Sequence, residues 1–100
     1  MLTVSDSDEI LSRLFGSVSR ARILEFLVSQ AGRAFYQREI MYETGLSLQP
    51  TQRELKNLFD LEIIKRRETA GKVYHEIDTL SPFFKPLREI CESAQKQNDA

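Results

Sequence analysis

The sequence predicts a mainly α-helical fold with a small β-hairpin, comprising about five helices and a sheet of two or three strands. In five segments, apolar side chains recur at the three- to four-residue spacing of one helix face. Between the fourth and fifth segments, EIIKRRET and KVYHEID read as two short strands joined near Ala70-Gly71. A chain of 100 residues makes one domain, residues 1–100.

The first helix is predicted over residues 7–15. Asp6, with Glu9 three residues later, resembles a capping box at its start. A second helix is expected over the segment VSRARILEFLVSQ, capped by Ser17 or Ser19. The segment RAFY then forms a short extended piece, so the chain leaves the second helix before a third begins.

Two helices joined by a tight turn are predicted over residues 36–60. The first, QREIMYET, ends at Gly45, and Ser47 caps the second after a Gly-Leu-Ser turn. Pro50 lies in the first turn of that second helix, where its missing N–H breaks no intrahelical bond. This arrangement is a helix-turn-helix.

The hairpin over residues 63–78 directly follows the helix-turn-helix and makes it winged. A last helix is predicted over 83–97, with Pro82 and Pro86 confining its start. The predicted fold class is therefore a winged helix-turn-helix.

Composition places the chain among ordinary globular proteins, with 41% hydrophobic and 29% charged residues. No apolar run is long enough to span a membrane, and the acidic start MLTVSDSDEI lacks the layout of a signal peptide. The single cysteine, Cys91, cannot form an internal disulfide, which suits a reducing compartment. We therefore expect a cytoplasmic protein without membrane contact.

The fourth helix is amphipathic, with leucines and Phe59 on one side and polar side chains on the other. Arginine pairs with guanine edges in the major groove, and glutamine or asparagine pairs with adenine edges. The residues predicted to read DNA bases are Gln49, Pro50, Gln52, Arg53 and Asn57.

Cations cluster next to this helix, although the net charge of the chain is only −1. Residues 65–72, KRRETAGK, carry four positive side chains and one negative one. Such a basic edge suits phosphates, which fix the register of a protein on DNA, and free N–H groups at a helix start add an anion site. The residues predicted to contact phosphate are Ser47, Lys56, Lys65, Arg66, Arg67 and Lys72.

Each of these features alone has a simpler interpretation. Any surface helix has a polar outer face, and a Lys-Arg-Arg run is usually a solvated strand. The turn, the helix face and the basic hairpin occur together and in order, which favours nucleic-acid binding. The main alternative is a winged helix used only for protein contact.

Three segments of the chain, LFGSVSRARILEFLVSQ, FYQREIMYETGLSLQPTQRELKNL and SPFFKPLREI, resemble winged helix-turn-helix transcriptional regulators of the ArsR-like superfamily. The similarity covers roughly residues 10–92 and is closest to a prokaryotic branch found alone or fused ahead of a nucleotidyltransferase domain. It implies that the fourth helix is the recognition helix, that 63–78 is the wing, and that the protein is a homodimer built from its terminal helices.

The sequence departs from that family at three places. Gln49-Pro50-Thr51 stands where the family usually has a small-residue pair and an aliphatic residue, and Leu61-Glu62 replaces the usual glycine after the recognition helix. The paired-cysteine box of the metal-sensing members is absent. No nucleotidyltransferase domain follows, so that activity does not carry over.

The terminal helices, predicted over 7–15 and 83–97, carry wide apolar stripes. Left exposed, such stripes would be a liability, so we expect them to meet a second copy of the chain. The alternative is that both stripes pack within one chain. The residues predicted for the dimer interface are Ile10, Leu14, Phe84, Leu87, Ile90, Cys91 and Ala94.

No catalytic, metal or cofactor site is predicted. His75 and Cys91 are the only soft ligands, and neither has a partner at metal spacing. We expect His75 to be a half-buried strand residue and Cys91 a buried small hydrophobe. Nothing in the chain supplies a nucleophile with a base and an orienting group.

The function predicted from the sequence is sequence-specific binding of double-stranded DNA by a homodimer that regulates transcription. The alternative is an adaptor whose winged helix docks a separately encoded partner, such as a nucleotidyltransferase. An enzyme is a distant third. The operator and any small-molecule effector are not readable from the sequence.

Overall fold

The structure is a computed structural model that describes residues 7–99. It contains five helices and one two-stranded antiparallel sheet, which confirms the predicted fold class. The elements are α1 (Ser7–Phe15), α2 (Val18–Ser29), α3 (Gln37–Thr44), α4 (Leu48–Asp60), β1 (Ile64–Thr69), β2 (Lys72–Ile77) and α5 (Phe84–Asp99). Asp6, predicted to cap the first helix, lies outside the described residues.

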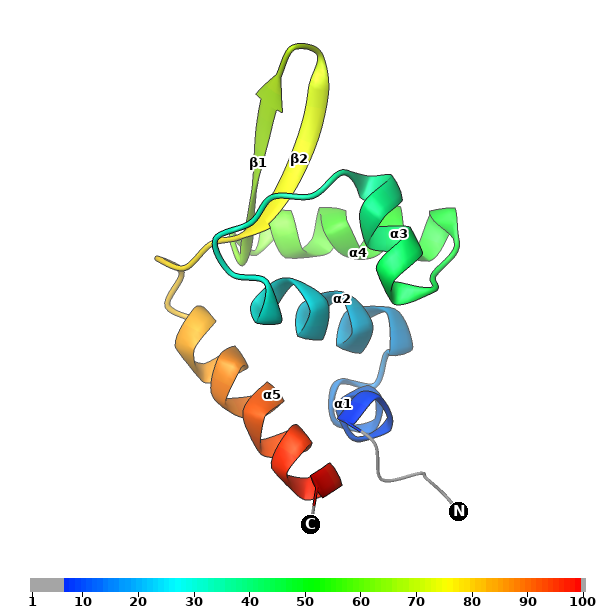
Figure 1. The fold of residues 1–100 in the computed structure, drawn as a ribbon, viewed down its shortest axis with the longest axis vertical. Helices are drawn as coiled ribbons and strands as arrows, with labels where there is room; N and C mark the ends of the chain where they lie inside the picture. The colour runs from blue at the N-terminus through cyan, green and yellow to red at the C-terminus, as the bar shows by residue number, and fades with distance from the viewer. Residues whose placement is uncertain (1–6, 100) are drawn as a thin grey trace.

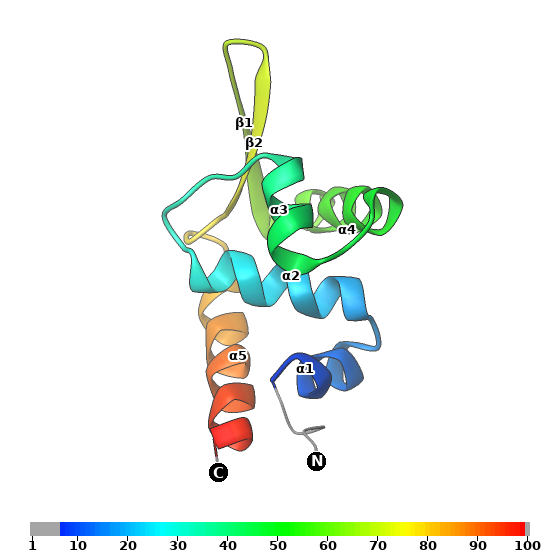
Figure 2. The ribbon, with the colours of Figure 1, turned by 45° about the vertical axis from the view of Figure 1, so that its right-hand side comes forward.

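The molecule is elongated, with principal extents of 46 × 28 × 20 Å. The hairpin of β1 and β2 projects at one end of the long axis, and α1 and α5 lie at the opposite end (Figure 1). Between them, α3 and α4 form a layer against α2, which the turned view also shows (Figure 2).

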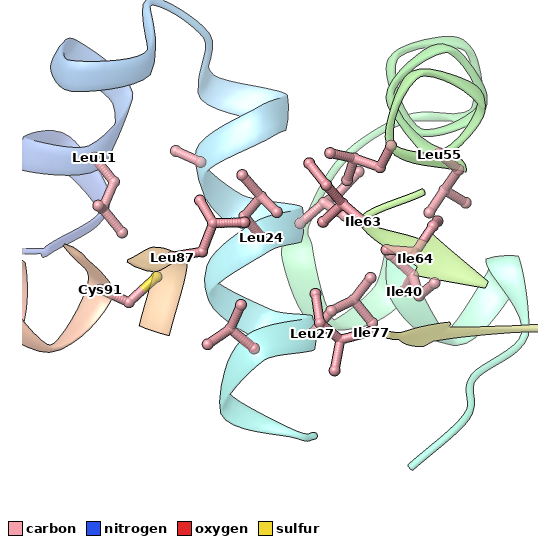
Figure 3. Packing of buried hydrophobic residues seen from close by; sticks show 14 of the residues in the cluster. Leu11, Leu24, Leu27, Ile40, Leu55, Ile63, Ile64, Ile77, Leu87 and Cys91 are labelled. Atoms are coloured by element: carbon pink, nitrogen blue, oxygen red, sulfur yellow. The ribbon is translucent and has the colours of Figure 1, made fainter. Parts of the chain in front are cut away.

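Helix α2 is the centre of the fold, because it contacts every other helix and strand β2. Its Leu24 and Leu27 lie between Leu87 and Cys91 of α5 on one side and the α3, α4 and hairpin side chains on the other (Figure 3). Ser17 caps this helix through its hydroxyl, which accepts a hydrogen bond of 3.1 Å from the backbone N–H of Arg20. The prediction of Ser17 or Ser19 is therefore resolved in favour of Ser17.

The turn between α3 and α4 has the predicted bounds. Gly45 adopts a left-handed conformation, with φ of 72°, and its N–H bonds to the carbonyl of Met41 at 2.9 Å. Ser47 takes the N-cap position of α4 in extended conformation, but its hydroxyl makes no capping hydrogen bond. The Thr51 hydroxyl instead donates to the Ser47 carbonyl at 2.8 Å.

The hairpin pairs Ile64 with Ile77 at its base and Thr69 with Lys72 at its tip. Ala70 and Gly71 both have positive φ, 53° and 76°, the conformation that a two-residue hairpin turn needs. A single antiparallel bridge between Phe35 and His75 extends β2 toward the segment before α3.

One part of the predicted packing is wrong. Leu48 and Phe59 were assigned to the buried side of α4, but they are 48% and 38% exposed. Glu54 is buried instead, at 5%, next to Thr51, which stands at the edge of the leucine side and is 0% exposed. The buried arc of α4 is thus turned toward its polar residues, because α2 supplies a charged partner there.

Candidate nucleic-acid interface

Helix α4 presents one polar face to solvent. Gln49, Gln52 and Arg53 are all exposed on it, and Pro50 is half-buried in its first turn. Within residues 7–99, no hydrogen bond or ion pair holds the side chain of Arg53. These predicted base-reading side chains are therefore free to meet a ligand.

Asn57 is differently placed. Its amide nitrogen donates to Glu54 at 3.1 Å, and the Glu54 carboxylate also accepts from Arg20 of α2 at 2.9 and 3.2 Å. The hydrogen bond to Glu54 raises the pKa of Arg20 further, so the guanidinium keeps its charge. To read a base with both amide atoms, Asn57 would have to release Glu54.

The pair of Arg20 and Glu54 was not expected from the sequence. The two residues stand 34 positions apart, so no local pattern joins them. The signal that could have found it is Glu54 itself, a carboxylate on the side of α4 that also carries Leu55 and Leu58. A charge on a buried arc requires a partner, because an unpaired buried charge is costly.

The hairpin adjoins the polar face of α4 through an aromatic contact. Phe59 stands seven residues after Gln52 and three after Lys56, so the three side chains share one side of the helix. The guanidinium of Arg66 in β1 lies over the Phe59 ring, 4.5 Å from its centroid. The polar helix face and one cation of the hairpin therefore form a continuous surface.

The remaining hairpin cations lie on the other face of the sheet. Because directly paired residues share a face, the ladder groups Lys65, Arg67 and Lys72 together, opposite to Arg66. Arg67 pairs with Glu76 at 3.2 Å, and both atoms lie on this face. The predicted phosphate contacts are thus divided between two surfaces.

Lys56 has an acidic neighbour on its own helix. Its ammonium lies 2.8 Å from the carboxylate of Asp60, and both side chains are exposed. Exposed pairs of this kind contribute little to stability. The pair can therefore open at small cost when a phosphate competes for the lysine.

His75 is paired with Arg66 and lies on the same face of the hairpin, and at 7% exposure it is more buried than the sequence predicted. Burial, and then the nearby charge of Arg66, lowers its pKa. Its Nδ1 atom is buried, and no residue in the described range 7–99 gives it a hydrogen-bond partner. The side chain acts as part of the hairpin core.

The opposite end of the molecule carries an apolar groove between α1 and α5. Ile10, Leu14, Pro86 and Ile90 line it, and Leu14 is 63% exposed. Ala94, also predicted for a dimer interface, lines this groove although it is only 4% exposed. The other predicted interface residues are placed inside the chain: Phe84 is half-buried against the core, and Leu87 and Cys91 are buried in it.

Cys91 is a buried small hydrophobe, as predicted, and burial raises its pKa to about 11. Among residues 7–99, no three His, Cys, Asp or Glu side chains gather as a metal site requires. In the same range, every helix is too short or too polar to cross a membrane.

Comparison of the chain with protein-family models, with curated proteins and with solved structures gives no match in any of the three. The similarity to ArsR-like regulators therefore remains a prediction from the sequence segments named above. A function for the chain has to be argued from its own residues.

Proposed function

We propose that the chain binds double-stranded DNA in a sequence-specific manner as a homodimer and regulates transcription. The observation that carries this proposal is the continuous surface of Gln49, Gln52, Arg53 and Lys56 with Arg66 of the hairpin. An α-helix with such side chains fits the major groove, where bidentate donors and acceptors distinguish base pairs.

The chemistry of each side chain on this surface indicates whether it would contact bases or phosphates. Arg53, exposed and unpaired within the described range, has the donors to pair with a guanine edge. Gln49 and Gln52 offer both a donor and an acceptor, which suits adenine. Lys56 and Arg66 lie at the border of the face, where the sugar-phosphate strands rise beside a groove.

Dimerisation supplies the second half of the site. A single short recognition helix reads few base pairs, and a two-fold pair of helices reads two half-sites one helical turn apart. The groove of Ile10, Leu14 and Ile90 supports this part of the proposal, because it leaves apolar surface open at the end of the molecule away from the hairpin.

The proposal is tested with Arg53→Ala against a selected duplex site, measured by fluorescence anisotropy. We expect specific binding to weaken by about 1–3 kcal/mol, with relaxed preference at one base pair per half-site. Arg88→Ala, an exposed arginine on α5, is the matched control and should bind as wild type does. Wild-type affinity in Arg53→Ala would show that this face does not read DNA.

The alternative of a protein-docking module is favoured by the acidic residues beside the cations. Lys56 and Arg67 form ion pairs with Asp60 and Glu76, and these carboxylates lower the net positive charge of the surface. Salt separates the two functions: DNA binding weakens steeply with ionic strength through counterion release, whereas docking of a neutral protein surface changes little.

A further inference from the structure

A pair of tyrosines links the start of α3 to the hairpin. The rings of Tyr36 and Tyr74 are stacked with centroids 4.7 Å apart and planes inclined by 28°. Their hydroxyl oxygens lie 3.0 Å from each other. Both views show the beginning of α3 beside the hairpin, which is where this tyrosine pair lies (Figures 1 and 2).

One of the two O–H groups of the tyrosine pair does not donate in the hydrogen bond between them. Each phenol has one proton, and either oxygen can donate in the hydrogen bond between them. Whichever donates, the other O–H has no acceptor within residues 7–99. Because both side chains are only half-buried, that O–H is accessible to a ligand.

Two cations flank the tyrosine pair. The guanidinium of Arg38 lies 5.9 Å from the Tyr36 ring centroid, and the ammonium of Lys72 lies 5.6 Å from it. Both side chains are exposed, and neither forms an ion pair within the described range. Contact with the ring restricts each cation, so less conformational entropy is lost when it binds an anion.

The nearby carboxylates are already engaged. Glu39 accepts a hydrogen bond of 2.8 Å from the backbone N–H of Tyr36, and Glu76 pairs with Arg67. The hydrogen bond with Tyr74, and then Lys72, lowers the pKa of Tyr36, despite an opposing effect of Glu39 and of partial burial. The same hydrogen bond, and then partial burial, raises the pKa of Tyr74.

We propose that Arg38, Lys72 and the tyrosine pair form a phosphate-binding site that contacts the DNA backbone at the face of the hairpin opposite to Arg66. Two cations lie within 6 Å of the Tyr36 ring centroid, beside the hydroxyls of the pair. Cations and an O–H donor are the groups from which a phosphodiester accepts hydrogen bonds. This inference rests on the proposed function. It adds Arg38, Tyr36 and Tyr74 to the residues expected to touch DNA, and it gives Lys72 a defined site.

The test compares Arg38→Gln with Arg88→Gln in duplex-binding titrations at several salt concentrations. Arg88 is a matched control, since it is an exposed arginine 5.4 Å from the Phe84 ring, on α5. We expect Arg38→Gln to flatten the slope of log K against log salt by about 0.9, the release of one phosphate contact. Arg38→Gln should keep the sequence preference of wild type, and Arg88→Gln should keep the salt slope of wild type.

A second variant tests the hydroxyls. The double substitution Tyr36→Phe and Tyr74→Phe keeps the stacked rings and removes both O–H groups. We expect binding to weaken by roughly three- to tenfold on every duplex, as loss of one hydrogen bond predicts.

The outcomes separate this inference from the proposed function. An unchanged slope in Arg38→Gln, with salt-dependent binding by wild type, overturns the phosphate site and leaves DNA binding intact. Wild-type affinity in the double phenylalanine variant removes the hydroxyls from the site. A wild-type protein that binds no duplex overturns both proposals.

Discussion

The two ends of the molecule leave surfaces of opposite chemistry exposed to solvent. At the end with α1 and α5, apolar side chains from two helices pack against α2, and an apolar groove is left over. At the end with α4 and the hairpin, apolar burial stops at the base of the hairpin, and the surface beyond it is polar and cationic. The long axis of 46 Å separates these chemistries.

The difference shows where each end can make contacts. An apolar groove gains free energy by excluding water with another apolar surface. A hydrated face of arginine, lysine and glutamine gains little from burial but can exchange water for base edges and phosphates. We therefore propose self-association at one end and DNA binding at the other, and the following predictions test both.

The largest expected effect lies at the apolar end. Ile90→Glu places a charge in the α1–α5 groove, and we expect the dimer to dissociate at least about 100-fold more readily, or about 3 kcal/mol. Because Ile90 also packs on the core, Ser93→Glu serves as a second variant that inserts a charge at an exposed position of the same groove. Sedimentation equilibrium on folded protein measures both. A wild type that is monomeric at micromolar concentration would contradict the assignment.

The next effect concerns the ion pair that holds α4 on α2. Glu54→Gln removes the charge opposite Arg20 while keeping the shape of the side chain, and we expect a loss of about 1–3 kcal/mol in the free energy of unfolding. Asp60→Asn, which breaks the exposed pair with Lys56 on the same helix, should change stability little. Urea unfolding followed by circular dichroism compares the two. Equal losses in the free energy of unfolding would mean that the buried pair of Arg20 and Glu54 is no more stabilising than the exposed pair of Lys56 and Asp60.

The smallest effect lies at the junction of α4 and β1. Glu62 has a φ of 59°, a left-handed conformation that costs a non-glycine residue free energy. Glu62→Gly should stabilise the fold by about 0.5–1 kcal/mol, because the relief of strain exceeds the added entropy of the unfolded chain. Glu62→Ala controls for loss of the carboxylate and should bring no such gain. Thermal unfolding of the three proteins decides the sign.

Local features of the fold could be predicted from the sequence. The bounds of α3, the left-handed Gly45 and the turn at Ala70-Gly71 follow from residue preferences that act over a few positions. The same holds for the hydrophobic spacing of α2. These signals depend on residues a few positions apart, so they can be read from a single sequence.

Features that depend on partners from distant segments could not be predicted. Glu54 is buried because Arg20 reaches it from α2, and Leu48 is exposed because none of the segments that the structure describes covers it. The tyrosine pair joins residues 38 positions apart. Leu87 lies in the core because α2 and α1 pack on α5. An apolar stripe on a helix has the same sequence pattern whether it packs within one chain or against a second copy.

Selection of bound sequences from random duplexes tests the proposal that α4 and the hairpin read double-stranded DNA. We expect enrichment of a palindrome with half-sites about one helical turn apart, and binding of the selected duplex that weakens steeply as salt is raised. No enrichment over the starting pool, with no salt-dependent binding of any duplex, would contradict the proposal.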